Sequence, residues 1–319
     1  MQTRIASTQD INKESYLNSI ADQIILSPGE PLNWGSNPGT PQAFGLAAAS
    51  SEVSYELDTD KVTRLNGLNN YSLSYLDMEN AAKLNNLALG ITISQDMSLT
   101  IQQSSNSTAN GNSTFAFNVL TSVDSEPSSA FLQYYVVANN YITNGSSYTS
   151  GIGAGSVIVV LPTVLANEST LILFARSSSD ERITSYAIYD FARSEQATEP
   201  ADGALTLSPL NYGVTVTGNT SDLSIQNAYV FSFSYQENLP STANTMQWSI
   251  PRLIDTSPFI ILINGISQGE FFQEWVSYPQ VPLKAGSNFQ GSEQNVFSYL
   301  VTIKDTVYKV EITFGDVPS

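Results

Sequence analysis

From residue 115 to the C-terminus the chain is a succession of short runs rich in Val, Ile, Phe, Tyr and Thr, separated by Ser, Gly and Asn turns. Because β-branched and aromatic side chains pack well on a pleated surface, these runs predict strands. Strand and turn spacing of this kind is typical of antiparallel sandwiches, and we expect one or two of them. The predicted strands are 115–120, 131–142, 157–161, 171–176, 183–191, 213–217, 228–235, 259–263, 270–276, 297–303 and 307–314.

Two hairpin turns are expected within this region. Asn264-Gly265 follows an apolar run, and Asn-Gly is a strong short-range signal for a tight turn between two strands. A second turn is expected at residues 304–306, between the last two predicted strands. The polar, low-complexity stretch 104–114 is predicted to be a loop and a domain boundary.

The N-terminus has a different pattern. Residues 4–26 are predicted to form one amphipathic helix, because apolar residues recur at helical spacing and form a single stripe. Pro28-Gly29 should end the helix. The following loop, 28–41, contains four Pro and three Gly, and we expect Trp34 to anchor it. The apolar stripe is formed by Tyr16, Leu17, Ile20, Ala21, Ile24 and Ile25.

Between this helix and residue 104 the pattern indicates a small α+β unit. Short strands are expected at 44–47 and 53–57, short helices capped by Asp58 and Asp77, and a closing strand at 91–101. The predicted fold class is therefore mainly β with an N-terminal α-helix. Its expected parts are a helix (1–28), a small α+β unit (29–104) and an antiparallel β-sandwich region (115–319).

The chain contains neither Cys nor His, which excludes disulfides, thiolate nucleophiles, Ser-His-Asp triads and imidazole metal ligands. Catalysis would have to depend on carboxylates, Lys or Tyr. We predict that the protein is not an enzyme, and we assign no catalytic residue, no cofactor site and no metal site. With 12 basic and 29 acidic residues the net charge is −17, which repels nucleic acid. Charged residues are only 13% of the chain, and neutral polar residues replace them, as in many secreted surface proteins.

Several motifs have a structural and a functional interpretation. Asp58-Thr59-Asp60 begins like a calcium loop but lacks the glycine at the sixth position and the acidic residue at the twelfth, so helix capping is preferred. Structural calcium bound elsewhere by some of the 29 carboxylates stays open. The glycine-rich stretch 151–155 precedes a strand, so it is interpreted as a turn and not as a phosphate loop.

Carbohydrate binding or cleavage is the first alternative function. Glu270 and Glu274 flank two phenylalanines and could form a carboxylate pair, although a strand with an acidic face in water explains them equally well. Trp248, Trp275 and Tyr278 could stack on sugars, but burial in a core is the preferred role. A viral surface protein is the second alternative, because it would share the Cys-free, Asn- and Ser-rich composition.

Six N-x-Ser/Thr sequons are candidate N-glycosylation sites. Several fall in predicted turns, where a glycan can be accommodated. The acceptor asparagines are Asn70, Asn106, Asn112, Asn144, Asn167 and Asn219.

Residues 24–99 show a specific order of short motifs: Ile-Ile-Leu-Ser-Pro-Gly-Glu-Pro-Leu-Asn-Trp at 24–34, Phe-Gly-Leu-Ala at 44–47, a Leu-Asp-Thr-Asp-Lys-Val segment from 57, and Tyr-Leu-Asp at 75–77 before Leu-Ala-Leu-Gly at 87–90. This order resembles archaeal type IV pilin-like surface proteins with a class III signal peptide. Segments 164–176, 182–189 and the C-terminal part from 278 are similar to β segments of the same proteins.

The resemblance implies an extracellular protein of the archaeal cell envelope, anchored in the membrane through a hydrophobic N-terminal helix. The sequence has no prepilin cleavage motif and no hydrophobic helix, so we expect residues 4–26 to be the water-exposed end of a longer helix, with Met1 an added start. The implied function is structural or adhesive, as in a type IV pilus or another cell-surface assembly. The implied partners are other subunits or surface proteins, in a homo-oligomer or a filament, with no nucleic acid.

Overall fold

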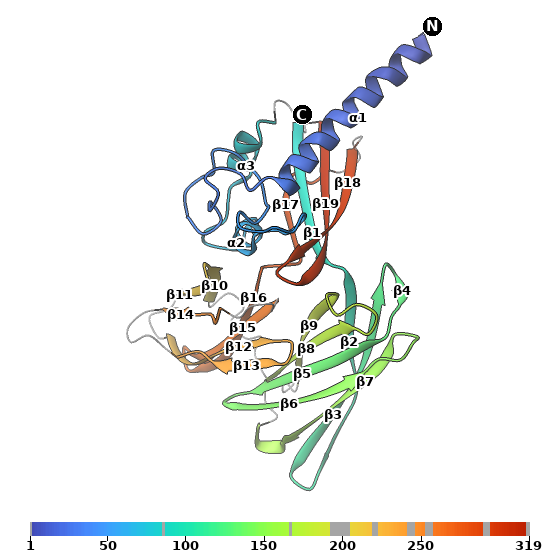
Figure 1. Ribbon diagram of the computed structural model, residues 1–319. Helices are drawn as coiled ribbons and strands as arrows, with labels where there is room; N and C mark the ends of the chain where they lie inside the picture. Colours follow the sequence, from blue (N-terminus) through green and yellow to red (C-terminus); the bar gives the residue numbers. More distant parts are fainter. Residues whose placement is uncertain are drawn as a thin grey trace. The chain divides into compact units, whose positions relative to one another are not determined.

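The computed structural model describes residues 2–84, 87–165, 168–191, 205–218, 223–240, 246–252, 258–289 and 294–316. The fold is mainly β with an N-terminal α-helix, as predicted, and its sheets are antiparallel (Figure 1). The chain forms two compact units that divide it elsewhere than the expected segments 29–104 and 115–319. Unit 1 contains Met1–Ser94, Pro279–Lys304 and Tyr308–Ser319, and unit 2 contains Gln95–Tyr278 and Asp305–Val307. The C-terminal strands therefore belong with the N-terminal helix.

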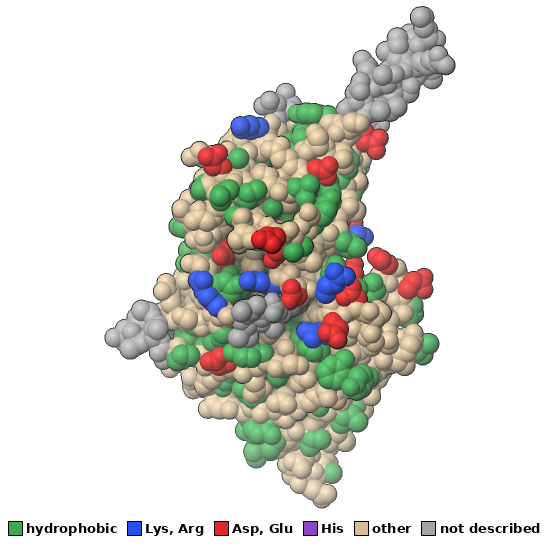
Figure 2. Space-filling model, viewed as in Figure 1, with side chains coloured by type: hydrophobic (Ala, Val, Ile, Leu, Met, Phe, Trp, Pro, Cys, Tyr) green, Lys and Arg blue, Asp and Glu red, His purple; other side chains and the backbone are tan. Residues whose placement is uncertain are grey.

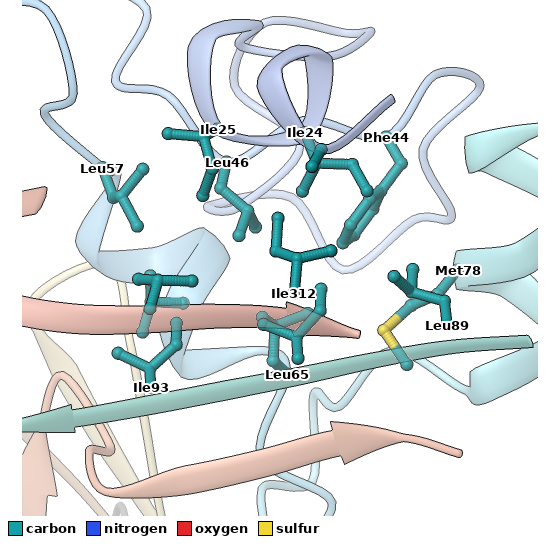
Figure 3. Close-up of a cluster of buried hydrophobic side chains, with 14 of the residues drawn as sticks. Ile24, Ile25, Phe44, Leu46, Leu57, Leu65, Met78, Leu89, Ile93 and Ile312 are labelled. Atoms are coloured by element: carbon teal, nitrogen blue, oxygen red, sulfur yellow. The ribbon is translucent and has the colours of Figure 1, made fainter. Parts of the chain in front are cut away.

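Unit 1 has one four-stranded sheet in the order β17-β1-β19-β18, with three helices. Its core is continuous from helix to sheet: Ile24 and Ile25 of the first helix lie above Ile312, and Leu65 and Ile93 lie beyond it (Figure 3). The elements are α1 (Gln2–Leu26), α2 (Thr59–Thr63), α3 (Tyr75–Ala82), β1 (Leu87–Gln95), β17 (Leu283–Gly286), β18 (Gln294–Ile303) and β19 (Thr306–Asp316).

Helix α1 confirms the predicted helix and most of its apolar stripe. Leu17, Ala21, Ile24 and Ile25 are buried at helical spacing, whereas Tyr16, expected in the stripe, is 59% exposed. The first turns of α1 run beyond the other elements of unit 1 (Figure 1). In the part of the chain that the structure describes, no helix combines the length and apolar character needed to cross a membrane.

The predicted cap is confirmed for α2 and is wrong for α3. Asp58 caps α2 as predicted: its Oδ1 accepts from the backbone N–H groups of Asp60 (2.9 Å) and Lys61 (3.0 Å). The prediction that Asp77 caps α3 is wrong, because the cap is Ser74, whose hydroxyl accepts from the Asp77 backbone N–H and donates to its carboxylate. Asp77 is therefore the third residue of the helix, and both its backbone N–H and its carboxylate bind the hydroxyl of the cap.

Two strand predictions in the first part of the chain need correction. Segments 44–47 and 53–57 form only isolated bridges, Ala47 with Leu57 and Glu56 with Thr302. The predicted strand 91–101 is interrupted at Asp96: β1 ends at Gln95, the first residue of unit 2, and the next strand begins at Met97.

Unit 2 is built from four sheets. The first contains β2 (Met97–Ala109), β3 (Asn112–Val123), β4 (Glu126–Pro127) and β7 (Ala154–Pro162). The second contains β6 (Tyr141–Tyr148), β5 (Ala130–Ala138), β8 (Ser169–Ser177) and β9 (Thr184–Phe191), and a short 3₁₀ turn, Thr163–Leu165, lies between β7 and β8. The third contains β13 (Tyr235–Asn238), β12 (Leu223–Ser232), β15 (Phe259–Ser267) and β16 (Glu270–Tyr278), and the fourth β10 (Leu205–Leu210), β11 (Gly213–Gly218) and β14 (Gln247–Ser249).

The four sheets are stacked as two sandwiches in contact with each other, because three apolar cores lie between successive sheets. In β5, Leu132 and Val136 contribute to the core shared with the first sheet, while Tyr135 and Val137 contribute to the core shared with the third. A strand that is buried on both faces has a nearly continuous apolar run, which explains the character of β5, β8, β12 and β15.

One predicted turn and one predicted loop are wrong, because pairing with another strand makes both segments part of strands. Asn264-Gly265 lies inside β15, and the turn falls at Gln268-Gly269 instead. Gly265 is opposite a bulge in β12, where a Cβ would collide with the carbonyl of Ser224. The expected loop 104–114 is the β2–β3 hairpin, whose turn, Asn110-Gly111, has φ values of 51° and 78°. The turn at 304–306 is confirmed, with Lys304 at φ 55°.

Candidate functional site

Charged residues are unevenly distributed along unit 2. The 71 residues from 97 to 167 contain two, Asp124 and Glu126, whereas the chain average of 13% would give about nine. Figure 2 agrees: the lower end of the view, where Figure 1 places the β2–β3 hairpin and β6, is tan and green without red or blue. The sequence contained this signal, but net charge and overall composition do not reveal it.

One exposed surface of this segment is the outward face of the first sheet. In β3 and β7, alternate residues such as Phe117 and Val159 point into the core, and the residues between them point outward. Three outward residues are apolar and exposed: Leu120 (57%), Ile158 (57%) and Val160 (51%). We define the outer face as Ser98, Thr100, Gln102, Ser105, Ser107, Ala109, Asn112, Thr114, Ala116, Asn118, Leu120, Ser122, Ala154, Ser156, Ile158, Val160 and Pro162.

The outer face is neutral, polar and aliphatic, and it carries neither charged nor aromatic side chains. Hydroxyl and amide groups form its rows along β2, while β7 supplies the aliphatic groups. Strand β2 is at the edge of the sheet and contains neither Pro nor a charged residue. This surface can bind a partner through apolar contact and neutral hydrogen bonds.

The sequons that the structure describes are on the surface. Asn70, Asn106, Asn112 and Asn144 are all exposed. Asn70 lies in a turn, whereas Asn106 and Asn112 lie in the two strands of one hairpin, because the expected loop there is a hairpin. The amide of Asn144 donates to the side chain of Gln236 at 3.4 Å. Asn167 and Asn219 lie outside the described residues.

The candidate sugar-binding aromatics are not on one surface. Trp248 is 5% exposed and Tyr278 is 1% exposed, and both belong to the core between the third and fourth sheets. The core role preferred for these two residues is confirmed. Trp275 is 42% exposed, so stacking on a sugar is available to Trp275 alone among the three.

The structure also places the candidate carboxylate pair and the glycine-rich stretch. Glu274 is partly buried and lies on the same face of β16 as the core residues Phe272 and Val276, so the interpretation of a strand with its acidic face in water is wrong for Glu274; the side chain of Glu270 is outside the described residues. The stretch 151–155 forms a turn that leads into β7, as predicted. Within the described ranges, no three Asp or Glu side chains converge as a metal site would require.

Two buried cations in unit 1 were missed by the sequence reasoning. Lys61 and Arg64 are 0% and 2% exposed, although basic side chains are rarely buried. The Lys61 ammonium donates to the carbonyls of Pro28 (2.8 Å) and Ala47 (2.7 Å). Burial lowers the pKa of Lys61 below its ordinary value, and the Asp58 carboxylate opposes that shift.

The buried guanidinium of Arg64 donates hydrogen bonds to backbone carbonyls of the Pro- and Gly-rich loop. Its Nε donates to Tyr71 O (2.8 Å), and Nη1 donates to Trp34 O (2.6 Å). The guanidinium also reaches the carbonyls of Asn37, Pro38 and Gly39. Burial lowers the pKa of Arg64, and Asp60 and Asp77 oppose the shift. The contacts satisfy carbonyls that a loop without regular structure would leave unpaired.

Trp34 anchors the same loop, as predicted. Its side chain is fully buried, its indole N–H donates to Gly45 O at 2.9 Å, and its ring lies 5.8 Å from that of Phe44. Arg64 lies over the ring at 5.5 Å. Together with Lys61, these residues fix the loop to the end of α1. We find a structural role in this cluster, since every polar contact is to backbone carbonyls.

No family model matches the chain, and no curated protein matches it either. Among solved structures, HBP35 of Porphyromonas gingivalis matches with a TM-score of 0.22 and 10% sequence identity. The match covers 57% of this chain and 63% of that chain, so it spans less than two thirds of the neighbour. At this level of similarity the match carries no argument about fold or function.

Proposed function

We propose that this chain is a structural or adhesive subunit of a cell surface, anchored through α1 and presenting unit 2 to its surroundings. The proposal includes an archaeal envelope location, which follows from the resemblance of residues 24–99 to type IV pilin-like proteins. It assigns no catalytic role. Assembly into a filament is part of the same proposal.

The observation that carries the proposal is the form of α1. Its C-terminal half is fixed to unit 1 by Leu17, Ala21, Ile24 and Ile25, while Lys13 to Tyr16 are exposed and the first turns run beyond the other elements. A helix that needed only to complete a globular core would end where its apolar stripe ends. A helix that connects a head to an anchor has to continue past it.

The outer face of unit 2 supports the same function. A surface of neutral hydroxyl and amide groups with exposed aliphatic residues has the composition of a contact surface, because charged residues are depleted at the centres of protein interfaces. The dispersed exposed sequons are consistent with an extracellular location, where glycosylation occurs.

The test uses cells that express the gene naturally. Antibodies against the recombinant chain should bind intact cells, and the protein should stay in the membrane pellet after alkaline carbonate washing. Mass spectrometry of the native protein should identify an apolar segment of about 18–20 residues joined to residue 2, long enough to span a bilayer. Labelling that requires cell lysis would contradict the surface location, and complete release by carbonate would contradict the anchor.

A further inference from the structure

We infer that the outer face of the first sheet is a contact between copies of this chain, with two copies packing this face together about a twofold axis. The inference deepens the proposed function by naming the partner. It concerns association in solution, so it can fail while the surface location holds.

The first step is the exposed apolar area. Ile158 and Val160 are successive outward residues of β7, and in the register of the sheet they lie beside Ala116 and Thr114 of β3. Leu120 lies beside Ala154 further along the sheet, and the neutral polar pair Asn118 and Ser156 separates these two residues from Ala116 and Ile158. Single exposed apolar residues are ordinary, but a contiguous group on a flat sheet face marks an interaction site.

The second step is the choice of partner. Copies of a chain with net charge −17 repel each other at long range. Of the 29 acidic residues, only Asp124 and Glu126 belong to segment 97–167. Two copies that approach each other through the outer face therefore bring few like charges together. A basic partner would instead be attracted to the acidic surfaces. A neutral face on an acidic molecule therefore fits a second copy best.

The chemistry of the face also favours protein over carbohydrate. Sugar sites generally present an aromatic ring to the sugar face, and the outer face has none. Its aliphatic side chains along β7 and its hydroxyl and amide groups along β2 and β3 are instead suited to sheet-on-sheet packing, in which two faces lie about 10 Å apart. A twofold axis makes one surface sufficient for both partners, since an isologous contact uses the same residues twice.

The size of the face sets the strength of the contact. The three strands have 13, 12 and 9 residues. At about 3.3 Å per residue and about 4.8 Å between strands, they cover about 540 Å² per copy. Stable interfaces bury about 800 Å² per partner, so we expect a weak, concentration-dependent dimer. Weak contacts of this kind become effective when the copies are held close together on one membrane.

The experiment is sedimentation equilibrium of the full chain, from dilute to near-millimolar protein, at low and at high salt. We expect the average mass to rise with concentration toward that of a dimer. Salt should strengthen the association, because the Debye length falls from about 30 Å at 0.01 M to about 3 Å at 1 M and the repulsion between copies is screened. An interface made of ion pairs would weaken instead.

Ile158→Glu places a charge among the exposed aliphatic residues of the face and should weaken association at least tenfold. The matched control is Leu300→Glu, which adds the same charge at a strand residue of unit 1 that is 63% exposed. Ile158→Ser removes the apolar group without adding a charge and should also weaken the dimer. Circular dichroism melting should show all three variants folded, since the positions are exposed.

Three results would overturn the inference: a monomer at every concentration and salt, equal weakening by Leu300→Glu and Ile158→Glu, or association that salt weakens. Binding of a neutral polysaccharide by a chain that stays monomeric would also overturn it. None of these results would affect the labelling of intact cells, so failure of this inference is distinguishable from failure of the proposed function.

Discussion

Arg64 gives the sharpest stability prediction, because one side chain holds five carbonyls of an irregular segment. In Arg64→Met the volume is largely retained and the donors are lost. Replacing a buried ion pair by apolar residues can be neutral, but only when both partners are replaced. Here the partners are backbone carbonyls, which remain in place and lose their donors.

The magnitude follows from which carbonyls water can reach. Asn37, Pro38 and Gly39 are exposed residues, so their carbonyls can turn to solvent at little cost. The carbonyl of Trp34 is buried and that of Tyr71 is partly buried, and each should cost about 1–3 kcal/mol when unpaired. The two together give about 2–6 kcal/mol, which is the loss in free energy of unfolding that we expect for Arg64→Met.

Arg64→Lys separates charge from geometry. It keeps a cation but has three donors on one atom and no planar fork, so it should lose about half as much stability as Arg64→Met. Urea unfolding followed by circular dichroism measures the free energy, and hydrogen exchange of residues 28–47 reports on the loop itself. A change below about 0.5 kcal/mol in Arg64→Met, the range of ordinary surface substitutions, with unchanged exchange would refute the argument.

Three further predictions concern other parts of the chain. Burial raises the pKa of Tyr135 and Tyr186 to about 12, above the ordinary ~10, so the unfolded chain loses these protons first and stability should fall between pH ~10 and ~12. Tyr135→Phe should flatten that fall in urea unfolding at a series of pH values, and a slope that does not change would contradict it. Ile24→Ala should cost about 2–5 kcal/mol, whereas Leu26→Ala, at a residue that is 45% exposed, should cost far less in the same assay. In protein from its native cells, Asn106→Gln should remove the mass of one glycan in intact mass spectrometry; an unchanged mass would show that the sequon is unused.

Patterns that act over a few residues predicted the elements well. The helix α1 and most strands follow from the spacing of apolar residues, which depends only on local geometry. The errors occur where pairing with another strand determines the local conformation. Gly265 looks like a turn residue, but it is required inside β15 by the bulge in β12, about forty residues earlier in the sequence.

The composition of β2 explains the other error. Its residues from Gln103 onward are Ser, Asn, Thr and Ala, which resemble a linker because few of them face a core. The stretch forms strand because β3 supplies the partner backbone and Asn110-Gly111 supplies the turn. Strand pairing needs backbone groups and not particular side chains, so side-chain propensity underestimates such a strand.

Lys61 and Arg64 could not be found by pattern alone. Charged residues in a short helix are normally on its exposed side, and nothing in the sequence near residue 61 indicates that the loop from residue 28 passes over them. The same holds for the pairing of β19 (Thr306–Asp316) with β1 (Leu87–Gln95), two strands that lie far apart in the sequence. Contacts of high sequence separation leave no periodic signal in either segment.

The charge gap from residue 97 to 167 has two different causes, and separating them strengthens the inference about the outer face. In β5 neutrality is required by folding, because cores lie on both sides of the strand and a charge there would be buried. That reason does not apply to Leu120, Ile158 and Val160, which are more than half exposed. On an isolated monomer, charges at these positions would cost nothing in packing and would improve solubility. Folding therefore does not require a neutral outer face and solubility opposes it, which supports the proposed contact between copies.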